Sequence, residues 1–268
     1  MTLAGAFRGE LYRTLRNGSP LFWAYCAVPL VMILMALVVE LSVGLDVSKA
    51  RGMRPFADVA VAPLATAGNP IAHLFYAVGA ATLFGGEYRW ETWRLLAPRN
   101  RRSRLVGAKF LVFALLVAAS LLAGLAATLA VRLLGAAVDG FSLGWKADGA
   151  TLLRLAAAFA GSVAEAAILG GVAACVAIAT RSVTAAILLP FLLSTSAVFA
   201  LEYYSPPALL DAMLLIPSHS GDALRSWAGG GPVDSTTALA SLAALVFLAL
   251  LPAAAAVLMF KRQDLARE

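Results

Sequence analysis

The chain has 268 residues, of which 61% are hydrophobic and only 13% charged, and its formal net charge is +6. Soluble domains are about half apolar and about a quarter charged, so no soluble fold of this size could cover so much apolar surface. The composition therefore excludes an ordinary soluble domain and predicts an integral membrane protein.

The first patterned segment lies before any long apolar run. Leu3, Phe7, Leu11 and Leu15 recur at every fourth position, while the arginines of this segment fall on other faces. This spacing predicts an amphipathic helix over residues 2–17 that lies in the membrane interface. A simple extension of the first span is the alternative interpretation. The apolar run that follows is too long for the apolar region of a cleavable signal peptide, so we expect it to stay in the protein.

Six apolar runs approach or exceed the roughly 20 residues that a helix needs to cross a bilayer. They cover residues 21–44, 63–86, 106–135, 153–180, 183–203 and 236–260. We therefore expect an all-α integral membrane protein with six transmembrane helices, folded as one domain over residues 1–268. Cys26 and Cys175 both fall inside these runs, where thiols usually pack as small apolar side chains.

The distribution of basic residues predicts the orientation of the spans. Fourteen of the 21 Lys and Arg residues lie in the N-terminal segment, in the loops after the second and fourth spans, and at the C-terminus. Short cytoplasmic loops are enriched in Lys and Arg, so both termini are expected in the cytoplasm. This topology accounts for the net positive charge, and no nucleic-acid partner is needed to explain it.

The loop between the second and third predicted spans carries the most informative pattern. Residues 87–97 can form a short helix with acidic side chains in its first turn, which suits the helix dipole, and with one face spaced as i, i+4, i+7. These positions are Glu87 and Glu91 for the acids and Arg89, Trp93 and Leu96 for the face. An ordinary basic loop with interfacial tryptophans is the alternative interpretation. It does not explain why an ordered acid–aromatic–Thr segment comes before a proline and a basic turn.

The order of residues in this loop resembles the loop between the second and third spans of ABC-2 type transporter permeases. The matching elements are an acid, a Thr, two leucines, a proline, a Ser–Arg pair and a Lys at the next span, here Glu87, Thr92, Leu95, Leu96, Pro98, Ser103, Arg104 and Lys109. Glu91 departs from the family pattern, which usually has Gly at that position, so the subfamily stays open. Six spans with both termini inside and an amphipathic N-terminal helix are also the family's layout.

The resemblance implies the ABC-2, or type V exporter-like, fold, in which residues 87–97 form a coupling helix against a separate ATPase. The ATPase-coupling residues would be Glu87, Arg89, Trp90, Glu91, Thr92, Trp93 and Leu96. The resemblance also implies a bacterial cytoplasmic (inner) membrane and a dimer with a second copy or a related permease. It further implies a short re-entrant or surface helix in the external segment 202–235, whose apolar run covers residues 208–216.

The sequence contains no G-x-x-x-x-G-K-[ST] phosphate loop, so the chain is not expected to be an enzyme that hydrolyses ATP by that route. No cofactor is expected in this chain, and ATP and Mg²⁺ would be bound by the partner ATPase subunit. The expected partners are that ATPase, a second permease and membrane lipid, with no nucleic acid.

Three ionisable residues inside the predicted spans are candidate pathway or gating residues, because charges at membrane depth are costly. Glu165 lies among Gly and Ala residues that permit close helix approach, and a hydrogen-bonded packing role is equally open. Glu40 could instead extend toward the external interface, and His73 could be a packed, hydrogen-bonded residue. Together they do not form the H-E-x-x-H pattern of a zinc protease.

The leading hypothesis is the permease subunit of an exporter for a hydrophobic or amphipathic substrate. The alternative is an ABC-2-like membrane transducer or assembly factor that passes ATPase motion to an extracytoplasmic partner. An intramembrane enzyme is the third hypothesis, and it predicts a nucleophile or metal-ligand set at membrane depth that the sequence does not contain.

Overall fold

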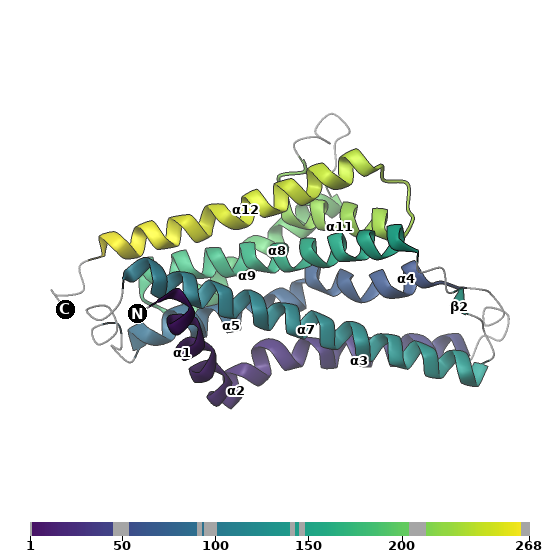
Figure 1. The fold of residues 1–268 in the computed structure, drawn as a ribbon, viewed down its shortest axis with the longest axis horizontal. Helices are drawn as coiled ribbons and strands as arrows, with labels where there is room; N and C mark the ends of the chain where they lie inside the picture. Colours follow the sequence, from purple (N-terminus) through teal and green to yellow (C-terminus); the bar gives the residue numbers. More distant parts are fainter. Residues whose placement is uncertain are drawn as a thin grey trace.

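The computed structural model describes residues 2–44, 54–89, 93, 101–139, 143–144, 148–203 and 213–263. These residues form a helical bundle, and the expected all-α class is confirmed apart from two short strands, β1 (Arg54–Pro55) and β2 (Leu143–Gly144), that pair in parallel. The helices run along one long axis (Figure 1). We call the end that holds the last turn of α12 the terminal end, and the end with α4 (Phe56–Val61) and the strands the distal end.

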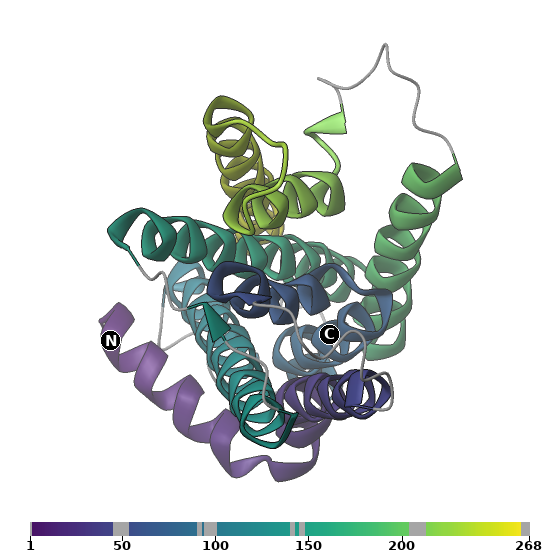
Figure 2. The same cartoon turned by 90° about the vertical axis from the view of Figure 1, so that its right-hand side faces the viewer.

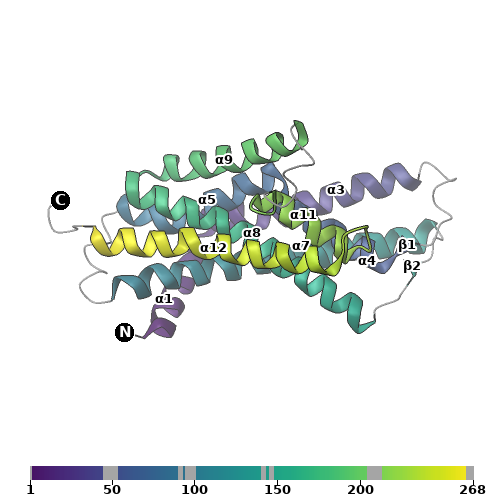
Figure 3. The same cartoon turned by 90° about the horizontal axis from the view of Figure 1, so that it is seen from above.

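Six long helices alternate in direction between these ends within the described part of the chain. They are α3 (Ala27–Gly44), α5 (Pro70–Arg89), α7 (Arg102–Asp139), α8 (Gly149–Thr180), α9 (Val183–Tyr203) and α12 (Ser235–Arg262). A short helix, α2 (Gly18–Leu21), and a π-helical turn, η1 (Phe22–Cys26), lead directly into α3. Seen from above, α9 forms one side of the bundle and packs on α5 (Figure 3).

Within the part of the chain that the structure describes, five helical segments are long and apolar enough to cross a membrane. They cover Gly18–Ser42, Arg102–Gly135, Gly149–Thr180, Val183–Ala200 and Ser235–Arg262. Helices of this length and composition indicate a multi-pass membrane protein. The second predicted span corresponds to α5, which has 20 residues and is not one of the five.

The segment predicted as one span over residues 63–86 is divided in two. Its first part is a 3₁₀ helix, η2 (Ala62–Gly68), and α5 starts only at Pro70. Asn69 between them is extended, with φ −78° and ψ 133°, because a residue before proline is sterically disfavoured in the α region. The Asn69 Oδ1 atom accepts a hydrogen bond from the Ile71 amide at 2.8 Å, which satisfies one free donor at the start of α5.

The amphipathic N-terminal segment forms a separate helix, α1 (Leu3–Arg16), which crosses the terminal end and packs on α7 (Figure 1). The Thr2 hydroxyl accepts a hydrogen bond from the Gly5 amide and caps its start. The helix ends at Asn17, whose φ of −93° and ψ of 78° are not helical. This break separates α1 from the first long helix, so α1 does not extend the first span.

Helix α8 lies in the middle of the bundle, between α12 on one side and α5 and α7 on the other (Figure 2). Its buried face is dominated by Gly, Ala and Ser, which lets neighbouring backbones approach closely. One close approach to α12 is at Gly171, where an added Cβ would lie 2.7 Å from Cγ of Pro252 and 3.3 Å from the Ala253 nitrogen. The small residues of α8 therefore determine how closely its neighbouring helices pack against it.

The segment before the last long helix contains α11 (Pro217–Ala228), which packs on α8 and α12. The re-entrant or surface helix was expected in the external segment 202–235, whose apolar run covers residues 208–216. Residues 208–212 of that run lie outside the described residues. The helix that the structure describes begins after the run, at Pro217, a favourable first position because proline lacks an amide hydrogen.

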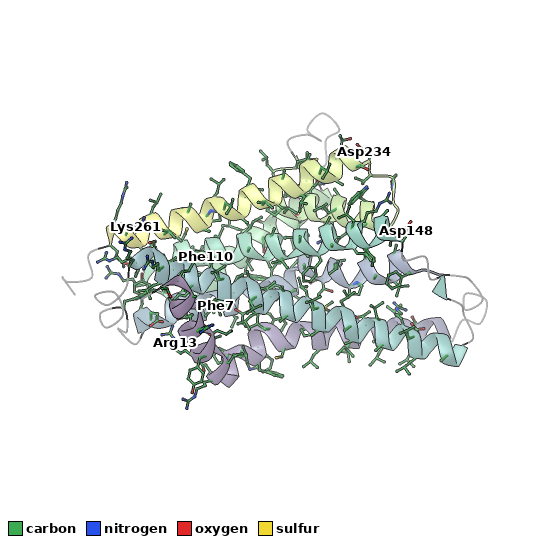
Figure 4. All side chains as sticks on the ribbon, viewed as in Figure 1. Phe7, Arg13, Phe110, Asp148, Asp234 and Lys261 are labelled. Atoms are coloured by element: carbon green, nitrogen blue, oxygen red, sulfur yellow. The ribbon has the colours of Figure 1, made fainter. Side chains whose placement is uncertain are left out.

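Two aspartates at the distal end start the long helices that return from it (Figure 4). Asp148 accepts a hydrogen bond from the Thr151 amide at 2.8 Å and caps α8. Asp234 accepts from the Thr236 amide at 3.1 Å and caps α12. The hydrogen bonds from Thr236 and Thr237 lower the pKa of the exposed Asp234 to about 2.

Replacing Gly171 by Ala should destabilise the protein, because the new methyl group meets the Pro252 ring and the backbone of α12. We expect a loss of about 1–3 kcal/mol, the usual cost of overpacking a tight interface. Gly86→Ala is the matched control in α5, since an added Cβ there has no atom within 4 Å. Thermal unfolding in detergent, followed by circular dichroism, measures both variants; equal midpoints for the two would contradict this account of α8.

Candidate functional site

A buried lysine joins three helices at the terminal end. Lys109 lies in the second turn of α7 and is only 1% exposed. Its Nζ atom donates hydrogen bonds to Oε1 of Glu10 at 2.8 Å, to Oε1 of Glu87 at 3.0 Å and to the Leu83 carbonyl at 2.6 Å. All three donor positions of the ammonium group are therefore used, by α1 and by the last turns of α5.

Arg13 of α1 completes this set of charges, and it pairs with both Glu10 and Glu87. Two carboxylates thus face two cations in a largely buried place. Removing one partner of a buried ion pair strongly destabilises a protein, because the other charge is then left uncompensated. We call Glu10, Arg13, Glu87 and Lys109, together with Trp93, the terminal cluster.

The ionisation of Glu10 reflects this surrounding. Burial alone would raise the pKa of its carboxyl group, but the nearby Lys109 and Arg13 outweigh burial and hold the pKa below its ordinary value of 4.5. The carboxylate is therefore charged at neutral pH, as its hydrogen bonds require.

Trp93 ties the loop after α5 to the end of α12. Its ring is 3% exposed and lies 4.3 Å from the ring of Phe260 and 5.9 Å from that of Tyr88, centroid to centroid. Lys109 Nζ lies 5.4 Å from the Trp93 centroid, within range of a cation–π contact. The loop residue therefore contacts the same lysine that holds α1, α5 and α7 together.

Two further contacts hold the end of α12 in this position. The Tyr88 hydroxyl donates to Oε1 of Gln263 at 2.7 Å. Arg102, at the start of α7, donates to the carbonyls of Lys261 and Gln263 at 3.1 and 2.5 Å, which are free because the helix ends there. The start of α7, the end of α5 and the end of α12 thus form one packed unit.

The predicted coupling residues are distributed in an unexpected way. Glu87 and Arg89 belong to the last turn of α5, whereas a separate helix was expected to begin at Glu87. Trp93 points into the protein and anchors the loop. The predicted coupling residues Trp90, Glu91, Thr92 and Leu96 lie outside the described residues.

Sequence reasoning singled out Glu87 and Lys109 without predicting that they touch, and it missed Glu10 and Arg13 entirely. One signal was present, because Glu10 is the sole acidic residue among the basic ones of the first 17 positions. The i, i+3 spacing of Glu10 and Arg13 predicts their own ion pair on one helix face. It does not predict the contacts that these residues make with Glu87 and Lys109.

Glu165, the mid-span carboxylate, forms an ion pair that the sequence did not predict. It is 3% exposed in α8, and its Oε2 atom accepts a hydrogen bond at 3.0 Å from Nη1 of Arg225 in α11. Gly68 and Gly221 make room for this pair, since a Cβ at either position would lie 2.8 Å from Arg225 Nη2. Helix α11 is thereby fixed to the centre of the bundle.

The other two intramembrane candidates have different surroundings. Glu40 of α3 is 8% exposed, and its Oε2 atom accepts a hydrogen bond at 2.5 Å from Nη1 of Arg132 in α7. His73 of α5 is 4% exposed and lines the same cavity as Glu165. The structure thus brings His73 and Glu165 together and places Glu40 in a separate ion pair.

Among the residues that the structure describes, no group of three His, Cys, Asp or Glu side chains is placed to hold a metal ion. Neither protein-family models nor curated proteins gave a match to this chain. Among the described residues, the terminal cluster, the Glu165–Arg225 pair and the Glu40–Arg132 pair are buried charged features. The first lies beside the loop that sequence analysis singled out, and the second lines a cavity.

Lys109→Met should destabilise the protein by about 3–5 kcal/mol, because it leaves buried carboxylates without their main cation. Glu87→Gln should also destabilise it, and the double variant should lose less than the two single losses together. We expect a coupling energy of about 1–3 kcal/mol, as for residues in one network. Denaturant unfolding of all four proteins gives this cycle; strictly additive losses would mean that the two side chains do not interact.

The stability that Glu10 contributes should depend on pH. Since its pKa is lower in the folded protein than in the unfolded chain, its contribution is present above the ordinary value of 4.5 and is lost as the pH falls below it. Unfolding midpoints measured from pH 6 down to pH 3 should therefore fall less steeply for Glu10→Gln than for the unchanged protein. If the unfolding midpoints of the two proteins fell equally steeply with pH, the Glu10 carboxylate would not be a source of the pH dependence.

Proposed function

We propose that this chain is the membrane-spanning permease subunit of an ABC-2 type ATP-binding cassette exporter. One observation carries the proposal. Glu87 and Lys109, which match the acid and the lysine of the family's loop pattern, are hydrogen-bonded to each other although 21 residues separate them in sequence. Two positions of the family's loop pattern thus form a hydrogen bond that holds α5 and α7 together on either side of the loop. A coupling element needs such a connection, because it has to pass a displacement of the loop to both helices.

The terminal cluster supports a mechanical role for this loop. A force on residues 90–100 would act through Trp93 on Phe260 of α12 and on Lys109, and through Lys109 on α1 and α5. Tightly packed contacts of this kind move as units, so small displacements at one end are passed along whole helices. Docking of an ATPase at this loop would therefore reach four helices at once.

The proposal includes six spans, with α5 as the second, and a cytoplasmic terminal end. The excess of Lys and Arg at that end supports the orientation, because cytoplasmic loops retain basic residues. With this orientation α1 is the interfacial helix, and α11 is a helix in the outer part of the membrane. The membrane would be the cytoplasmic membrane of a bacterium.

The chain contains no phosphate loop, so a separate subunit would bind ATP and Mg²⁺ and hydrolyse the ATP. The complete transporter would hold two such subunits and two permeases, either two copies of this chain or this chain and a relative. The substrate would be hydrophobic or amphipathic, in keeping with the apolar spans. Stimulation of ATP hydrolysis by substrate separates this exporter from a transducer, which would respond to an extracytoplasmic protein.

Trp93→Ala should weaken the coupling between the permease and its ATPase. We expect the ATP hydrolysis rate of the reconstituted complex to fall by at least about fivefold. This factor corresponds to the lower end of typical coupling free energies between two sites, about 1 kcal/mol. The complex is formed by expressing this chain together with each phosphate-loop protein that its gene neighbourhood encodes. Trp227→Ala is the matched control, because Trp227 contacts Arg154 far from the loop.

The control should keep ATP hydrolysis within about twofold of the unchanged complex, because Trp227 packs on a separate core cluster and distant sites without shared partners act nearly independently. Membrane insertion of both variants is checked by the yield of purified protein. A Trp93→Ala complex with full activity, or the lack of any ATPase that binds this chain, would overturn the proposal.

A further inference from the structure

A small cavity lies between α5, α8, α9 and α11, away from the terminal cluster. Its volume is about 170 Å³. His73, Glu165 and Ser218 line one side of it, and Pro190, Leu193 and Ala197 of α9 contribute to a mainly apolar wall. Ser194 of α9 also lines the cavity, but its hydroxyl already donates to the Phe191 carbonyl at 3.1 Å. Leu193 is 60% exposed, so the apolar wall reaches the outer surface of the bundle, where lipid would lie.

Each of the three polar residues is more than nine-tenths buried and has a side-chain atom without a hydrogen-bond partner. These atoms are Oε1 of Glu165, Nδ1 of His73 and Oγ of Ser218. Buried polar atoms in native proteins are almost always paired, so three unpaired ones around one cavity indicate a missing ligand or water. A shared occupant would satisfy all three.

The chemistry of the three atoms favours an occupant that donates hydrogen bonds. Glu165, as the carboxylate paired with Arg225, can only accept hydrogen bonds, and Oε1 is its oxygen without a partner. In a neutral His73 imidazole, the tautomer with its proton on Nε2 leaves the unpartnered Nδ1 as an acceptor. Ser218 Oγ can accept as well as donate.

The charge at this place favours a cation. Arg225 is paired with two carboxylates, Glu165 at 3.0 Å and Asp222 at 2.9 Å, so the group carries one excess negative charge. Arg225 does not line the cavity, whereas Glu165 does. An entering cation would therefore meet a carboxylate first.

We propose that this cavity binds the primary ammonium group of an amphipathic amine. The ammonium group has three donors, which match the free atoms of Glu165, His73 and Ser218. The cavity has room for this group and the first carbons attached to it, and the remaining apolar part would lie against α9. A free alkylamine and the headgroup of an ethanolamine lipid share this chemistry. Binding by the chain itself needs no ATPase, so the proposal goes beyond the exporter function and can fail independently of it.

The test uses the full chain in phosphatidylcholine nanodiscs, which contain no primary amine. Tritiated dodecylamine should bind saturably by scintillation proximity after the signal of empty nanodiscs is subtracted, and unlabelled dodecylamine should displace it. Dodecanol, which has the same alkyl chain without the charge, should not displace it. Addition of phosphatidylethanolamine to the nanodiscs identifies the source: competition assigns the cavity to a lipid headgroup, and lack of competition assigns it to a free amine.

Two variants test the residues. Glu165→Gln should lower the affinity for dodecylamine by about tenfold or more, since it removes the charge that faces the cavity. Because this change also weakens the pair with Arg225, Ser218→Ala serves as a second variant that breaks no ion pair, and it should lower the affinity several-fold. Ser241→Ala is its matched control, because Ser241 is also fully buried with an unpartnered hydroxyl but does not line the cavity.

Three results would overturn the proposal. They are the absence of saturable binding, displacement by dodecanol as strong as by dodecylamine, and equal affinities for Ser218→Ala, Ser241→Ala and the unchanged chain. Absence of saturable binding would leave water as the occupant of the cavity. Displacement by dodecanol would mean that the alkyl chain alone is recognised, and equal affinities would mean that the amine binds elsewhere on the chain.

Discussion

The buried ammonium group of Lys109 is the interaction on which the terminal end of the bundle depends. A lysine at 1% exposure is tolerated only because two carboxylates and a carbonyl replace its water, one from α1 and two from the last turns of α5. The same ammonium lies over the ring of Trp93. One charge thereby holds together α1, the end of α5, the start of α7 and Trp93.

The centre of the bundle uses a second buried ion pair in a different way. The Glu165–Arg225 pair connects α8 to α11, and it fits because Gly68 and Gly221 leave space beside it. Helix α8 also packs closely on α12 at its glycines. Close backbone packing therefore positions α12 against α8, and the ion pair positions α11. A displacement of α12 at the terminal end would therefore reach α8 and, through Glu165, the cavity that His73 and Ser218 line.

Much of this architecture could be predicted from periodicity and apolar length alone. The helix over residues 183–203 agrees with α9 at both ends, and the amphipathic repeat of α1 identified a separate helix. The break at Asn69 was not predicted, although Pro70 is visible in the sequence, because apolar content over residues 63–86 masked the local effect of the proline. The two residues that pair with the predicted Glu165 and Lys109, Arg225 and Glu10, depend on tertiary packing, which single-sequence patterns do not contain.

The account's central claim is that an ATPase docks at the loop between α5 and α7. Site-specific photocrosslinking tests this most directly, with benzoylphenylalanine in place of Thr92 in the loop and, separately, in place of Lys146 in the loop between α7 and α8. In cells that make the whole complex, the account predicts a crosslink from position 92 to a chain that contains a phosphate loop, and none from position 146. Absence of that crosslink at position 92, or its appearance at position 146, would contradict the account.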